Sequence, residues 1–146
     1  MTMTDSTVAG NAADIAEAFP LVDPGAIPLG ARVLVQLRKA KKRMTESGII
    51  LPEETRDTER AQNPVAKVIA LGPLAFKKRD TMESWVEGTW CEVGDFIRVP
   101  KWGGDRWEVP VPGETRDDDP ALFMVLNDHE VIAKLTGDPL AMKAFL

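Results

Sequence analysis

The side chains that most often carry chemistry are few in this sequence and lie far apart along it. The chain has one histidine, His129, and one cysteine, Cys91. A zinc site or a cysteine nucleophile needs several such groups close together, so neither is easily assembled. The aspartates at 117–119 lack the spacing of a calcium loop, and Gly103-Gly104 lacks the rest of a phosphate-binding motif. We therefore predict no catalytic residue, no metal site and no bound cofactor, with His129 at the surface in a polar turn.

A short apolar run offers a different chemistry, namely reversible docking on another protein. Gly48, Ile49, Ile50 and Leu51 interrupt a charged and polar connection at residues 39–63. Loops longer than ~12 to 15 residues are usually functional or disordered. Burial of three aliphatic side chains contributes roughly 5 to 9 kcal/mol, whereas fixing the backbone costs roughly 1 to 2 kcal/mol per residue. A single loop should therefore bind weakly; the alternative is that this run is one more strand of the core.

The segments around this connection have the short, alternating pattern of β-strands, with turn residues between them. We expect strands at residues 32–37, 65–71, 96–99, 106–111, 122–126 and 131–135. In the first of them, Val33, Val35 and Leu37 should share one face. In the second, alternation places Leu71 on one side and Ala70 on the other. Short strands without intervening helices predict an all-β domain.

Both ends of the chain extend beyond this β-rich part. In the leader, Val8, Ala12, Ile15 and Phe19 fall at helical spacing and predict a short amphipathic helix. Its apolar side could pack on the core, on a neighbouring subunit or on nothing. At the other end, Asp138-Pro139 is typical of a helix start, and the residues after it should form a second short helix.

The composition argues against several classes of function. A net charge of −5 and an isoelectric point near 4.9 disfavour nucleic-acid binding through a basic surface. A single cysteine allows no internal disulfide. The first ten residues do not read as a secretory signal, and no apolar stretch reaches the ~20 residues of a membrane helix. We expect a cytoplasmic protein with no nucleic-acid partner and no membrane contact.

Five motifs follow one another in an order that is more specific than any of them alone. They are a Pro-Leu pair leading into a strand (residues 27–35), a glycine-led aliphatic tip (47–52), a strand ending in glycine (65–72), a Val-Gly-Asp turn with its strand (93–99), and two closing strands around a polar turn (123–133). In this order the chain resembles the GroES-like co-chaperonins, the chaperonin 10 family, which form ring-shaped lids on bacterial-type chaperonins. The resemblance covers residues 27–135, roughly three quarters of the sequence.

This resemblance implies a fold, a partner and a set of contact residues. The fold would be a small β-barrel at 27–135, with a mobile loop at 39–63, a roof hairpin at 73–88, and short helical extensions at 1–26 and 136–146. The residues that bind a GroEL-type chaperonin would be Gly48, Ile49, Ile50 and Leu51, and ATP would be bound by that partner rather than by this chain. A ring, heptameric in the family, would form through contacts between Ile27, Pro28 and Leu29 of one subunit and Val131, Ile132 and Ala133 of the next. The alternative is that these two strands pair within one subunit.

Several positions depart from the family pattern. Ala31 stands where the family usually has aspartate, Ser47 where it often has a second loop glycine, and the sequence contains no tyrosine for the dome opening. Such divergence resembles a phage-encoded member, acting in the host cytoplasm. Because a fold does not fix a function, a virion structural or decoration protein built on the same barrel is the main alternative. A small-barrel nucleic-acid binder is a weaker one, given the acidic charge.

Overall fold

The computed structural model describes residues 5–39, 64–112 and 120–141, with the side chains of the N-terminal helix described from Ala12 onward. Along this part of the chain run one α-helix, six strands and one short 3-10 helix. Their bounds are α1 Asp5–Ala18, β1 Arg32–Leu37, β2 Val65–Leu71, β3 Phe96–Arg98, β4 Asp105–Val109, β5 Ala121–Asn127, η1 Asp128–Glu130 and β6 Ala133–Lys134.

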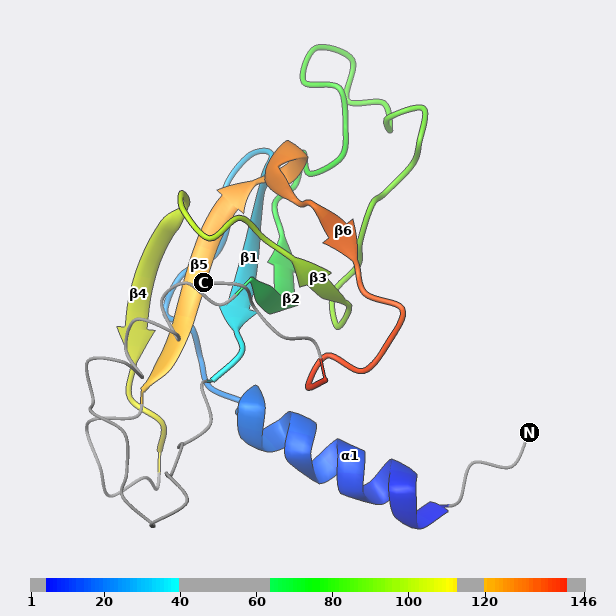
Figure 1. Cartoon of the computed structure of the whole chain (residues 1–146). Coiled ribbons are helices and arrows are strands. Elements are labelled where there is room, and N and C mark those ends of the chain that lie inside the picture. Colours follow the sequence, from blue (N-terminus) through cyan, green and yellow to red (C-terminus); the bar gives the residue numbers. More distant parts are fainter. Residues whose placement is uncertain (1–4, 40–63, 113–119, 142–146) are drawn as a thin grey trace.

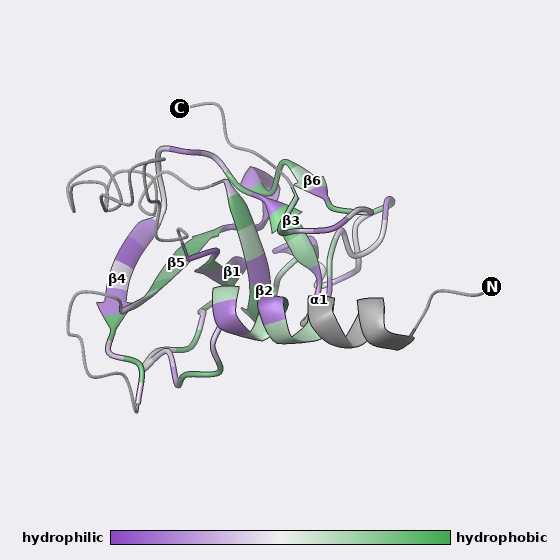
Figure 2. Cartoon of the chain, turned by 60° about the horizontal axis from the view of Figure 1, so that its bottom comes forward, coloured by the Kyte–Doolittle hydropathy of each residue, from purple (hydrophilic) through white to green (hydrophobic). Residues whose placement is uncertain are grey.

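The strands form a single antiparallel sheet in the order β4-β5-β1-β2-β3-β6 (Figure 1). The all-β prediction is therefore confirmed at the level of a mostly β fold with a short helix. Among the described residues β4 and β6 each have a strand partner on one side only, so hydrogen bonds do not close this sheet into a barrel. The central strands β1, β2 and β5 carry most of the buried apolar residues of the described chain. Figure 2 shows a mainly hydrophilic β4 beside a mainly hydrophobic β5.

Strand β1 lies between β2 and β5, and both of its faces are buried. Val33, Val35 and Leu37 face the main core together, as their spacing predicts. Leu34 belongs to a second, smaller cluster on the other face, packed against Val22 of the leader. The leader therefore covers part of this face of β1, together with side chains of β2, β4 and β5.

Strand β2 contains a β-bulge that the alternating pattern does not reveal. Leu34 pairs with Ala70 and Val35 pairs with Val68, so Ile69 is an extra residue in β2. Beyond the bulge, Leu71 packs on the main cluster and Ala70 on the second one. Leu71 and Ala70 still lie on opposite sides of β2, but the inserted residue exchanges the two faces beyond it. Leu71 therefore contacts the main cluster, where uninterrupted alternation would place Ala70, and Ala70 contacts the second cluster.

Of the two helices predicted at the chain ends, the structure describes the first and only the start of the second. The N-terminal helix is confirmed: α1 ends at Ala18, and Phe19, only 3% exposed, packs on Phe96 with ring centroids 5.2 Å apart. At the other end, the Leu140 amide donates to Asp138 Oδ1 in a turn, but most of the predicted second helix lies outside the described residues. No helix within the described ranges is long and apolar enough to cross a membrane.

Strand limits differ from the expected ones mainly at β6, which spans Ala133–Lys134 rather than residues 131–135. The reason is η1, which ends at Glu130 and leaves Val131 and Ile132 in an irregular stretch before the strand begins. Val131 is buried in the main core and Ile132 is 62% exposed. Burial does not alternate beyond this pair, because Ala133 and Lys134 are exposed as well.

Candidate docking site and subunit edges

The predicted docking residues Gly48, Ile49, Ile50 and Leu51 lie outside the described residues, and the structure instead defines the base from which they depart. Strand β1 leads into residues 40–63 and β2 follows them, and these two strands are antiparallel neighbours, with Leu37 opposite Ala66. One residue further, the Arg38 amide donates to the carbonyl oxygen of Val65 at 3.0 Å. The described residues on either side of the connection, Arg38 and Val65, are thus held next to each other at one end of the sheet.

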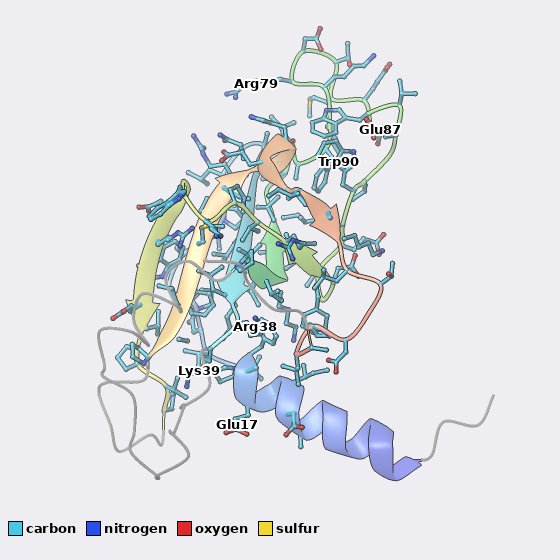
Figure 3. All side chains as sticks on the ribbon, in the orientation of Figure 1. Glu17, Arg38, Lys39, Arg79, Glu87 and Trp90 are labelled. Atoms are coloured by element: carbon cyan, nitrogen blue, oxygen red, sulfur yellow. The ribbon has the colours of Figure 1, made fainter. Side chains whose placement is uncertain are left out.

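Both chain extensions reach this base. The Lys39 amide donates to the carbonyl oxygen of Ala18, the last residue of α1, at 3.0 Å. The Arg38 guanidinium donates to the carbonyl oxygen of Pro139 at 2.7 Å. Figure 3 shows Arg38 and Lys39 between the end of the sheet and α1, on which Glu17 is labelled. Burial, and then the nearby positive charge of Arg98, lower the pKa of Arg38, and Asp138 partly offsets this.

The first predicted interface segment is presented to solvent. Ile27 is 78% exposed and Leu29 is 64% exposed, whereas Pro28 between them is buried. This segment lies in no strand. It follows Pro24, whose carbonyl oxygen accepts a hydrogen bond at 2.8 Å from the indole of Trp107 in β4. Its chain therefore comes from the β4 edge of the sheet.

The second predicted interface segment is at the opposite edge, where β6 pairs with β3 and not with residues 27–29. The alternative that the two segments pair within one subunit is therefore wrong. Of the three residues, Val131 is buried, whereas Ile132 and Ala133 are exposed. An open groove of about 400 Å³ is lined by these residues and by Glu87 and Trp90. Figure 3 labels Glu87 and Trp90 on the segment before β3.

The turn before β3 is tied to β6 by charge. Asp95 Oδ2 accepts the Glu92 amide hydrogen at 2.8 Å and lies 3.3 Å from Lys134 Nζ. The backbone hydrogen bond from Glu92 is the main cause that lowers the pKa of Asp95, with Lys134 adding to it. Here the Val-Gly-Asp motif stabilises the β3–β6 edge.

The cysteine and the histidine have environments that fit no catalytic pair. Cys91 is buried, and burial followed by the charge of Asp95 raises its pKa to about 11, which keeps the thiol protonated. His129 has a side chain that is 69% exposed, as predicted for a surface turn.

Two residues that sequence reasoning missed organise the end of the molecule opposite α1. Asp128 is 3% exposed, and its Oδ2 accepts the buried amide hydrogen of Phe76 at 2.9 Å. Phe76 has a φ of 59° and packs edge-on against Trp85 with ring centroids 5.5 Å apart. An aspartate in a polar turn gives no sequence signal of burial, so only the fold reveals this anchor.

Comparison with known proteins decides among the functions that this geometry allows. The model of the family described as Cpn10, the chaperonin 10 kDa subunit, matches residues 26–135. The chain belongs to this family. It is 32% identical over 120 residues to the co-chaperonin GroES of Methylacidiphilum infernorum, covering 80% of this chain and all of the relative.

Two further relatives carry the same name. The co-chaperonin GroES of Syntrophomonas wolfei is 30% identical over 109 residues, covering 74% of this chain and 95% of the relative. That of Aquifex aeolicus is 29% identical over 106 residues, covering 73% of each chain. The predicted co-chaperonin function is confirmed by this membership, and because co-chaperonins of the family are not enzymes, so is the non-enzymatic prediction. These relatives are bacterial and lend no support to a phage origin.

Proposed function

We propose that this co-chaperonin is one subunit of a cytoplasmic ring-shaped lid that docks on a GroEL-type chaperonin and encloses folding proteins. The observation that carries the proposal is the family match at residues 26–135, within which an apolar run sits on a connection between two paired strands. In this proposal Gly48, Ile49, Ile50 and Leu51 bind the chaperonin. ATP is bound by the chaperonin, and this chain needs no cofactor.

The docking contact is weak for each subunit and strong for the ring. Burial of Ile49, Ile50 and Leu51 contributes roughly 5 to 9 kcal/mol, and ordering the connection offsets most of this. Once one arm has docked, the others bind at a raised effective concentration, so avidity exceeds single-site affinity by ~10² to 10⁴. A lid built this way closes firmly and remains releasable.

The ring is assembled, in this proposal, through two unlike surfaces of each subunit. The surfaces are Ile27, Pro28 and Leu29 on one side and Val131, Ile132 and Ala133 on the other. Two observations support this: the first segment leads away from the β4 edge with two exposed aliphatic side chains, and the second lines a groove at the β6 edge. Contacts between unlike surfaces run head to tail, and they form a closed ring when the rotation between subunits permits. We infer seven subunits, as in the family.

The finer architecture follows the same model. We infer that the sheet at residues 27–135 closes into a small barrel, that residues 73–88 form the roof hairpin, and that 1–26 and 136–146 are extensions. Support comes from Figure 1, in which the segment after β2 rises at the end of the molecule opposite to α1. The base of the docking connection, at Arg38 and Val65, lies at the α1 end, so the roof segment and this base are at opposite ends of the described chain.

A substitution in the apolar run tests the docking proposal. Ile50→Asp places a charge where an aliphatic side chain must be buried, so the ring should form normally and fail to bind the chaperonin with ATP present. Val86→Asp is the matched control, because Val86 is a 97% exposed aliphatic residue in the roof segment. Native mass measurement, with and without chaperonin and ATP, reads out both the ring and the complex. Normal binding by Ile50→Asp would refute the assigned site.

A further inference from the structure

The two extensions that lie outside the family match, 1–25 and 136–146, converge on one short stretch of the chain. That stretch is the end of β1 and the two residues after it, Gln36 to Lys39, from which the docking connection departs. The N-terminal extension contacts Gln36 and Lys39, and the C-terminal extension contacts Arg38.

The N-terminal extension is held there by a buried polar contact. Gln36 is 2% exposed, and its Nε2 donates to the carbonyl oxygen of Pro20 at 2.9 Å. An unpaired buried amide is costly, so Gln36 requires the leader at this position. Phe19, buried against Phe96, adds an apolar anchor beside it. Together these contacts bring the C-terminal end of α1 onto the Lys39 amide.

The C-terminal extension is held by a charged donor. The Arg38 guanidinium, half-buried, reaches across 101 positions of sequence to the carbonyl oxygen of Pro139. A hydrogen bond from a charged donor is stronger than a neutral one. The backbone of the same residue is fixed on the other side by the bond from its amide to Val65. Arg38 therefore joins β1, β2 and the C-terminal turn.

We infer that the two extensions form a clamp whose role is to position the docking connection, with Gln36 and Arg38 as the positioning residues. The inference rests on the proposed docking function of residues 39–63. A backbone residue that is already fixed in the free lid loses no further conformational entropy when the lid binds. The clamp fixes the residues at the base before binding, so it strengthens docking without touching the chaperonin.

The test is Arg38→Met in the full-length chain, which removes the donor and keeps the length of the side chain. We expect chaperonin binding to weaken at least about tenfold, the equivalent of about 1.4 kcal/mol, since releasing one backbone residue costs about that much. Arg38→Lys, which restores a charged donor, should recover part of the loss. Arg79→Met, at an exposed site in the roof segment, is the matched control and should bind as the wild type does.

Two further measurements separate positioning from a loss of fold. Hydrogen exchange of the Lys39 amide should accelerate in Arg38→Met, while the melting temperature and the ring mass stay close to those of the wild type. Where Arg38→Met fails to assemble, truncation after Thr136 removes the Pro139 acceptor without altering Arg38, and its chaperonin affinity decides the question in the same way.

Each outcome bears on the inference. Weakened binding by an intact ring, with recovery in Arg38→Lys, supports the clamp. Unchanged binding by Arg38→Met, while Ile50→Asp abolishes binding, overturns the clamp and leaves the docking function in place. Normal binding by Ile50→Asp overturns the docking function and the clamp with it.

Discussion

Replacing Asp128 by alanine should destabilise the subunit more than the same replacement of Asp80, an aspartate in an exposed turn. Asp128 is 3% exposed, and its two carboxylate oxygens accept the amide hydrogens of Phe76 at 2.9 Å and of His129 at 2.7 Å. The bond to Phe76 is buried, so the substitution leaves a buried donor unpaired. A lost hydrogen bond of this charged kind costs roughly 1.5 to 3 kcal/mol.

The conformation of Phe76 adds to this cost. Its φ of 59° lies in the left-handed region, which bulky residues rarely adopt, and the bond to Asp128 helps to hold it there. The expected loss in free energy of unfolding is therefore about 2 to 4 kcal/mol. The aromatic packing of Phe76 with Trp85 should loosen as well, so near-ultraviolet circular dichroism should weaken.

The assay is urea or thermal unfolding at one fixed protein concentration, because assembly also contributes to apparent stability. Asp80→Ala is the matched control: Asp80 Oδ1 also accepts a backbone amide hydrogen, from Thr81 at 2.9 Å, but in an exposed turn. It should change stability by no more than about 0.5 kcal/mol. Equal effects of the two substitutions would show that burial of the acceptor is not what stabilises this end of the fold.

Three further predictions concern other sites. Gly72→Ala should destabilise the subunit strongly, because the added Cβ would overlap the carbonyl oxygen of Gly30. Gly88→Ala, where the added Cβ would have no heavy atom within 4 Å, should cost only about 1 kcal/mol for the positive φ of this residue. Comparison of the two unfolding curves checks this prediction. Because the pKa of Asp95 is lowered in the folded state, its contribution to stability is present above the usual aspartate pKa of about 3.9 and is lost as the pH falls through the folded-state pKa. The difference in free energy of unfolding between wild type and Asp95→Asn should therefore vanish in acid. A difference that stays constant with pH would contradict this linkage. With a pKa of about 11, Cys91 should resist iodoacetamide at pH 8 in the native protein and react on unfolding; rapid native labelling would show that the thiol is accessible.

The sequence predicted those elements whose apolar pattern is strong and local. The limits of β1 and β2 agree with the structure to the residue, because each is a run of β-branched and aliphatic residues bounded by turn or polar residues. The helix α1 was found from helical spacing, and Phe19, the last residue of that pattern, is its buried anchor.

What the sequence could not show depends on contacts between distant segments. The bulge at Ile69 inserts one residue without altering the composition of the strand, so nothing local marks it. Gln36 alternates with apolar residues and looks like a solvent-facing position, yet the leader covers it. The bond from Arg38 to Pro139 spans most of the chain. For the site itself, the assignment of residues 48–51 to docking stays a prediction from sequence.

The central position of β1 has a consequence for how this protein is made. Its partner β5, the last long strand along the described chain, ends at Asn127, whereas β1 begins at Arg32. During translation, Val33 and its neighbours in β1 therefore cannot pair with β5 until most of the polypeptide has emerged from the ribosome. Long-range antiparallel pairing of this kind is slow to form and leaves apolar surface open to aggregation meanwhile. A protein whose work is to help others fold is thus itself exposed to misfolding while it is being synthesised.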